Sequence, residues 1–481
     1  MAEVLRQVNV TAPKFDDAHG VLSLDGPDST VTLTGNLPIA GESVPGWFDL
    51  RLGCPDGREV LIHNAVRTSM SFPSGSSVRS ATYFPNMVVD NASSVGAEGM
   101  VRSVTFALEG WHKCFAYNYV ETLDVFGNPP ESLRAALEAS RFEFYRDEMF
   151  APEQVFVVND LGTIIDFDVG GRRYSIFAGQ QNRVGRRQLN VEFRLLGTIQ
   201  FPEPVDLETA TDACWDWRRY FNQMAMSELS FTGMAVASEL DPTAPCGNLY
   251  LPYEESVERP RQREPVAARH MPLNQWNERD AARDAMRKWL GQQGDRRVFR
   301  SALDRVLSRP GHVSTEDAVA LCAGIDTLQA LRSRESLPVG ALDAMTSATI
   351  AAAKKFNAAI EEDRVRSLLG SLQNDDLRRR LWRLVQIAAP ETDQTEVEHL
   401  IANLLPLRLF GAHGRLPAQN NELLAGPTVE ALAALCARYD LQDAGVPDHS
   451  SSGGRSHPRL QWDEALFALK MLEENGNGDT Q

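Results

Sequence analysis

The first half of the chain, up to about residue 255, alternates apolar and polar residues in short runs. Residues 21–24 and 30–34 alternate in this way around a turn that contains glycine and proline, which is typical of an antiparallel hairpin. A second hairpin is expected at 163–169 and 172–177, because Gly170-Gly171 between them can adopt the positive φ angles of a tight turn. Further strands are expected at 47–52, 59–65, 101–108, 154–158, 189–201 and 229–236, and helices at 131–142 and 206–222.

From about residue 274 onward, apolar residues recur at every third or fourth position, which is the spacing of one helix face. One such face begins at Ala318, shortly after Ser314 and Asp317, which form a capping box with aspartate in place of the usual glutamate. Similar faces occur at 341–360, 375–387, 396–407, 429–439 and 462–472. The second half is therefore predicted to be helical.

The change of pattern predicts an α+β multidomain protein. Residues 1–255 would form a β-rich domain of antiparallel sheets with a few helices, and residues 274–475 an all-α helical bundle. Residues 256–273, rich in proline and arginine, are expected to be a linker, and residues 476–481 a disordered tail. A length of 481 residues agrees with more than one domain.

The composition is that of a globular protein, with 43% hydrophobic and 23% charged residues. No apolar run approaches the roughly 18 residues of a membrane span, and the N-terminus lacks the apolar core of a secretory signal. We therefore expect a cytoplasmic protein without a membrane partner. The formal net charge of −17 opposes constitutive binding to nucleic acid, although it allows a local basic groove.

Several familiar chemistries lack their sequence signatures. The six cysteines are scattered without the spacing of a zinc site, and we expect them to be buried thiols. The chain has no Walker-type phosphate loop, no G-x-S-x-G elbow and no H-E-x-x-H motif. Neither a metal nor a cofactor is therefore expected.

One candidate for catalysis is the run Arg408-Leu-Phe-Gly-Ala-His413, which closes an apolar helical stretch. A pattern this loose arises about once by chance in a chain of this length, and Arg263 with His270 form a second case in the charged linker. The helical context favours Arg408 and His413. Such a pair can bind a phosphate through the guanidinium and transfer a proton through the imidazole, because an ordinary histidine titrates near pH 6.5.

This arginine–histidine pattern in an all-α C-terminal region resembles the signature of the HEPN superfamily of ribonucleases. An acidic residue on an upstream helix, Asp326, is similar to the family's layout, which often has glutamate there. The order of strands in the first half, including residues 62–65 and the Gly110-Trp111 step, resembles the N-terminal domain of ApeA-type antiphage proteins.

The resemblance implies a metal-independent endoribonuclease of antiphage defence (abortive infection) with Arg408 and His413 as the catalytic pair. The ribose 2′-OH would attack the phosphate, so the substrate would be RNA, with tRNA as one candidate. The family expectation is a homodimer or higher homo-oligomer through the helical domain, and a second arginine–histidine pair from the two-fold related chain would complete the site. A phage-derived activator would act on the N-terminal domain.

Two features depart from the family pattern. Leu409 stands where a polar residue often follows the arginine, and Pro406 is expected to kink the helix just before Arg408. Because five residues of regular helix separate two side chains by about 140°, the pair also requires the helix to end or distort near His413. An alternative is therefore a catalytically inactive HEPN fold, a dimerisation or adaptor module with a ligand-sensing β domain.

Other residues are weaker candidates. His399 on the same helix and Arg415 beyond it could assist as an extra base and a phosphate contact, together with Asp326. His63 is expected to be a satisfied structural histidine, and the cluster at 214–217 is expected to pack against the sheet. A third reading of the β-rich domain is a carbohydrate- or peptide-binding unit.

Overall fold

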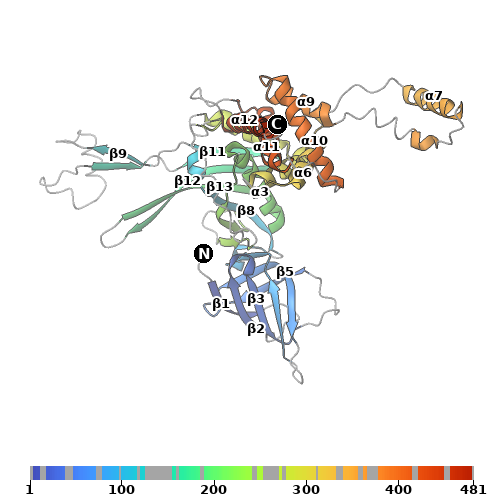
Figure 1. The fold of residues 1–481 in the computed structure, drawn as a ribbon. Helices are drawn as coiled ribbons and strands as arrows, with labels where there is room; N and C mark the ends of the chain where they lie inside the picture. The colour runs from blue at the N-terminus through green and yellow to red at the C-terminus, as the bar shows by residue number, and fades with distance from the viewer. Residues whose placement is uncertain are drawn as a thin grey trace.

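The computed structural model has a β-rich N-terminal part followed by an all-helical C-terminal part, as the sequence predicts (Figure 1). It describes residues 4–10, 18–37, 47–71, 78–96, 99–115, 120–124, 154–158, 162–184, 189–240, 246–252, 270–273, 278–309, 313–331, 340–355, 361–365, 377–413, 421–448 and 456–478. The helix expected at 131–142 lies outside these residues, as does most of the linker expected at 256–273.

Six strands at the N-terminus form a closed antiparallel barrel, because β5 pairs with both β4 and β6 in the order β5-β4-β1-β2-β3-β6. Buried residues alternate along these strands and fill the barrel with their own core, which includes Leu33, Leu50 and Ile62. The strands are β1 (Val4–Val10), β2 (His19–Leu24), β3 (Thr30–Gly35), β4 (Trp47–Gly53), β5 (Glu59–Ser71) and β6 (Arg79–Phe84).

The sheet continues from the barrel through β7 into a second group of antiparallel strands, in the order β7-β15-β14-β8-β13-β12-β11. The tight turn at Gly170 and Gly171, both with positive φ, joins β11 to β12 as predicted. These strands are β7 (Met87–Val89), β8 (Val101–Leu108), β11 (Thr163–Val169), β12 (Arg172–Val184), β13 (Leu189–Val205), β14 (Phe231–Ala237) and β15 (Gly247–Tyr250); β9 (Val120–Asp124) pairs separately with β10 (Gln154–Val158).

Helix α3 (Leu207–Ala225) packs against this second group of strands. Asp206 caps its N-terminus by accepting a hydrogen bond from the Thr209 main-chain N–H, which stabilises the first turn. Trp217 is fully buried and contacts Phe106 and Tyr174 edge to face. The cluster at 214–217 therefore packs against the sheet, as expected.

The C-terminal half of the described chain is helical. The predicted capping box is present, because Ser314 and Asp317 exchange hydrogen bonds at the start of α6. The helices are α4 (Arg279–Gly291), α5 (Gln293–Leu307), α6 (Thr315–Thr327), α7 (Ala341–Lys355), α9 (Leu377–Ala388), α10 (Gln394–His413), α11 (Asn421–Asp443) and α12 (His457–Gly478). A short 3₁₀ helix, η6 (Gln329–Leu331), follows α6, and a short α-helix, α1 (Trp111–Phe115), lies in the first half.

The two halves share one hydrophobic core. Trp289 and Met286 of α4, together with Leu441 at the end of α11, belong to the same buried cluster as Trp217 and the sheet residues. A second cluster lies mainly in the helical half and includes Met226 at the end of α3. The β-rich part is therefore completed by helices that follow the expected linker in sequence.

The cysteines and the C-terminal end differ in part from what the sequence predicts. Cys54 is half-buried and Cys246 is exposed, so the expectation of six buried thiols is wrong for these two. Helix α12 extends to Gly478, and residues 479–481 of the expected tail lie outside the described residues.

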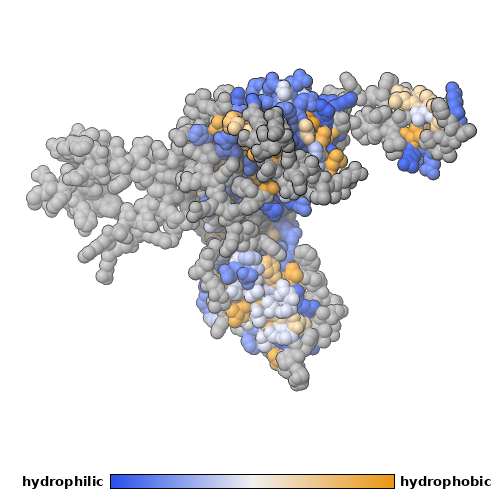
Figure 2. Space-filling model, viewed as in Figure 1, coloured by the Kyte–Doolittle hydropathy of each residue, from blue (hydrophilic) through white to orange (hydrophobic). Residues whose placement is uncertain are grey.

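Among the described residues, none of the helices is both long and apolar enough to span a membrane. Figure 2 shows hydrophobic residues on the visible face in small patches between hydrophilic ones.

Candidate functional site

Helix α10 packs into the helical core through a buried apolar stripe, because Val397, Leu400, Ile401, Leu404 and Leu407 recur at helical spacing. Arg408 lies at the edge of this stripe, four residues after Leu404. The Arg408 side chain is 36% exposed, and the next residue, Leu409, is 51% exposed. The packing of α10 therefore fixes which way Arg408 faces.

Arg408 is held by an acidic residue of another helix. Its Nη2 donates a hydrogen bond to Oδ2 of Asp326 at 3.1 Å, and Asp326 stands in the last turn of α6. A guanidinium has five N–H donors, so this bond leaves other donors of Arg408 for a ligand. The structure thus brings together Arg408 and Asp326, two of the residues singled out in the sequence.

A third residue, Arg380 of α9, joins this pair. Its Nη1 donates to Oδ1 of Asp326 at 3.0 Å and to the main-chain carbonyl of the same residue at 2.9 Å. The Asp326 carboxylate therefore lies between two arginines. Sequence reasoning missed this role of Arg380, because the residue stands in a run of three arginines that looks like an exposed helix face.

Buried Cys322 lies on α6 one turn before Asp326, on the same side of the helix. Burial raises the pKa of its thiol to about 12, and the nearby Arg408 charge only partly opposes this shift. Cys322 is thus a neutral packing residue beside the site and not a nucleophile.

His413 is the last residue of α10, and its side chain lies outside the described residues. The helix continues through Pro406 and ends at His413, so Arg408 and His413 share one helix over its final turns. At regular helical geometry their Cβ atoms point about 140° apart. Arg415, the other expected contact, lies outside the described residues.

His399 is not brought to Arg408 within one chain. Nine residues of helix separate the two side chains by about 13.5 Å along the axis and by about half a turn around it. His399 instead lines a hollow of about 220 Å³ between the start of α10 and α12, together with Asp393, Glu396 and Lys470. It therefore faces a different part of the molecule.

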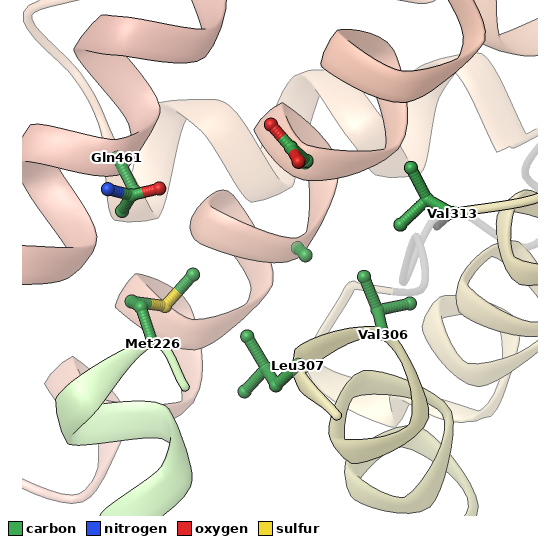
Figure 3. A pocket seen from close by; sticks show the side chains of 7 residues that line it. Met226, Val306, Leu307, Val313 and Gln461 are labelled. Atoms are coloured by element: carbon green, nitrogen blue, oxygen red, sulfur yellow. The ribbon is translucent and has the colours of Figure 1, made fainter. Parts of the chain in front are cut away.

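A second, smaller pocket of about 30 Å³ lies where the end of α3 meets α5, α11 and α12. Figure 3 shows Met226, Val306, Leu307 and Val313 pointing into it, with Gln461 at one side. Its volume suits about one water molecule, and its lining is mainly apolar. This pocket offers no group for acid–base chemistry apart from Glu430 at its wall.

His63 has a structural partner, as expected. Its Nδ1 lies 2.9 Å from Oδ1 of Asp49 on the neighbouring strand, and its Nε2 lies 3.9 Å from Oε1 of Glu208 on α3. The hydrogen bond with Asp49 raises the pKa of His63, and burial opposes this shift only in part. His63 thus connects the barrel to the start of α3.

Among the described residues, no group of three or more His, Cys, Asp or Glu side chains has the arrangement of a metal site. Comparisons of the chain with protein-family models, with curated proteins and with solved structures find no match.

Proposed function

We propose that the protein is a metal-independent endoribonuclease of the HEPN type. The observation that carries the proposal is the Arg408 guanidinium, held by Asp326 on a half-exposed surface of the same helix that ends at His413. An oriented guanidinium with donors to spare suits a phosphate oxygen, because arginine binds phosphate through a planar fork of N–H groups.

In the proposed reaction, His413 takes the proton from a ribose 2′-OH or returns one to the leaving 5′-oxygen. Arg408 stabilises the charge that develops on the phosphate. One histidine cannot readily do both in a single step, so Arg408 and His413 of two protomers form a composite site in a homodimer. The product end is a 2′,3′-cyclic phosphate, and no metal or cofactor takes part.

The biological setting that we propose is antiphage defence in the cytoplasm. The helical half cleaves RNA, with tRNA as one candidate substrate, and the β-rich half detects an infection signal such as a phage-derived activator. The shared core supports this division of labour, because residues of α4 and α11 lie in one buried cluster with the strands of the β-rich half.

The first experiment compares the full-length wild type with Arg408→Ala and His413→Ala, both for RNA cleavage with EDTA present and for toxicity in cells under activating conditions. Each variant is expected to lose at least a hundredfold in cleavage rate, since general acid–base catalysis by His413 contributes about 10²–10⁴-fold and one electrostatic donor such as Arg408 about 10²–10³-fold. An exposed lysine of α12, Lys470→Ala, serves as a surface control. Unchanged toxicity in both site variants, with no cleavage by the wild type, would refute the proposal.

A second candidate function follows from Leu409. An apolar side chain that is 51% exposed beside Arg408 is better suited to a protein contact than to a polar substrate. The corresponding function is an inactive HEPN fold that acts as a dimerisation or adaptor module. A double Arg408/His413 alanine variant that retains all biological activity, while Leu409→Asp abolishes it, would favour this second function.

A further inference from the structure

Arg380 and Arg408 share one carboxylate. Nη1 of Arg380 donates to Oδ1 of Asp326 at 3.0 Å, and Nη2 of Arg408 donates to Oδ2 at 3.1 Å. The three residues come from α9, α6 and α10, so three helices meet at this carboxylate. Among the described residues, the two arginines against this one carboxylate leave a net positive charge at this point.

The two arginines differ in burial. Arg380 is only 9% exposed, on the same face of α9 as the buried Leu377, Leu381 and Leu384, whereas the Arg408 side chain is 36% exposed. A substrate as large as RNA can therefore reach Arg408 but not Arg380. The Nε of Arg380 is buried without a hydrogen-bond partner among the described residues, which is unfavourable for folding.

Arg380 is also anchored independently of the Asp326 side chain. Its Nη1 donates to the Asp326 main-chain carbonyl at 2.9 Å, close to the end of α6. Carbonyls in the last turn of a helix lack partners within the helix, and a cation there is favourable. Arg380 therefore keeps a fixed position against which the carboxylate is held.

We propose that Arg380 is a positioning residue, which acts through the Asp326 carboxylate to orient Arg408 toward the phosphate of the substrate. The proposal rests on the proposed ribonuclease function. A carboxylate alone beside Arg408 would orient the guanidinium. It would also cancel the positive charge of the guanidinium and compete with the substrate phosphate for its N–H groups. Arg380 supplies the compensating charge, so Arg408 is oriented and remains cationic toward the substrate.

The test uses full-length protein, with kcat and KM for RNA cleavage measured in EDTA well below the unfolding temperature. Arg380→Met is expected to raise KM and to lower kcat/KM at least tenfold, and Arg380→Lys, which retains the charge, is expected to recover most of this loss. Arg378→Met is the matched control, because Arg378 pairs with Glu398 and joins α9 to α10 at an exposed position.

A double variant separates this role from a merely structural one. Adding Asp326→Asn to Arg380→Met removes the unbalanced carboxylate, so it is expected to lower KM again relative to Arg380→Met alone. Equal kinetics for Arg380→Met and Arg378→Met, or a further rise of KM in the double variant, would overturn the positioning role while leaving the ribonuclease proposal intact.

The failure of the function itself is recognised separately, by wild-type protein that cleaves no RNA. The Nε–H NMR signal of Arg408, identified by its loss in Arg408→Ala, then decides the positioning role. A signal that is ordered in the wild type and in Arg378→Met but averaged in Arg380→Met would support it. A signal that is the same in all three proteins would overturn it.

Discussion

His63 of the barrel is paired with Asp49, and the strength of this pair depends on whether His63 is protonated. Hydrogen bonding to Asp49 raises the pKa of His63 above its usual value of 6.5. Burial alone would raise the pKa of Asp49, but the hydrogen bonds from His63 and from the Asn64 main-chain N–H lower it overall. Asp206 and Glu208 at the start of α3 also favour the protonated imidazole.

Because folding raises the His63 pKa, the protonated pair stabilises the folded state below pH 6.5 and loses this contribution as the pH rises through the folded-state value. We predict that His63→Gln removes about 1 kcal/mol of unfolding free energy at low pH, a small amount because Asp49 is partly exposed. Denaturant unfolding of the wild type and the variant between pH 5 and 8 measures this difference in unfolding free energy. The exposed His19→Gln serves as control, and an unchanged pH profile in His63→Gln would contradict this reading.

At the scale of elements, α5 and α6 approach each other closely at Gly324, two residues before Asp326. A Cβ atom added there would lie 2.9 Å from the Cα atom of Phe299 on α5. Glycine is therefore required by the packing of two helices and not by a turn. The site depends on this contact, because α6 carries Asp326 to Arg408.

We predict that Gly324→Ala lowers the unfolding free energy by roughly 1–3 kcal/mol, since the added methyl group forces the helices apart. It should also reduce RNA cleavage by displacing Asp326. Gly294→Ala is the control, because a Cβ atom there meets nothing within 4 Å and should raise the unfolding free energy by up to about 1 kcal/mol. Calorimetry compares the two, and equal effects would show that the helix contact is not tight.

At the scale of the whole molecule, Asp440 of α11 holds α4 and α5 together beside the core that the two halves share. It is fully buried and accepts hydrogen bonds from Arg296 at 2.6 Å, from Arg300 at 2.7 Å and from the Trp289 Nε1 at 2.8 Å. Burial alone would raise the pKa of Asp440, but the two arginines lower it overall. Trp289 also packs against Tyr220 of α3, so this ionic cluster borders the shared core.

Asp440→Asn is predicted to lower the unfolding free energy by about 3–5 kcal/mol, because two buried arginines lose their counter-charge. Asp443→Asn is the matched control. Its side chain is 38% exposed and also pairs with Arg296, so about 1 kcal/mol or less is expected. Thermal unfolding of both variants measures the two losses of unfolding free energy. Losses of similar size would mean that the burial of Asp440 contributes little to stability.

Local patterns in the sequence predict many elements of this fold, although the strands β1, β6 and β7 were not among those expected. The hairpin at Gly170-Gly171 and the capping box at Ser314 depend on neighbours within a few residues, so their physical causes can be read from the sequence. Contacts between distant segments cannot be read in this way. Arg380 meets Asp326 across 54 residues, and α4 completes a β-rich core from beyond the expected linker.

In the candidate site, too, the residues can be picked out from the sequence, but their positions relative to one another cannot. Residue type and helical context singled out Arg408, and the resemblance to the HEPN layout singled out Asp326; the structure places the two side chains 3.1 Å apart. His399 was grouped with them because it lies on the same helix as Arg408. Nine residues of regular helix, however, place the two side chains on opposite sides of that helix. The positions of His413 relative to Arg408 across two chains remain a prediction of the composite site.

The chemistry of the cut RNA end tests the proposed ribonuclease most sharply. An RNA oligonucleotide and the same oligonucleotide with one 2′-deoxynucleotide at the cleavage position are incubated with full-length protein in EDTA, and the products are analysed by mass spectrometry. We predict a 2′,3′-cyclic phosphate on the cut RNA, no cleavage at the deoxy position, and no product with Arg408→Ala. Cleavage at the deoxy position, a 3′-hydroxyl end, or equal cleavage by Arg408→Ala would contradict attack by the 2′-OH with Arg408 at the phosphate.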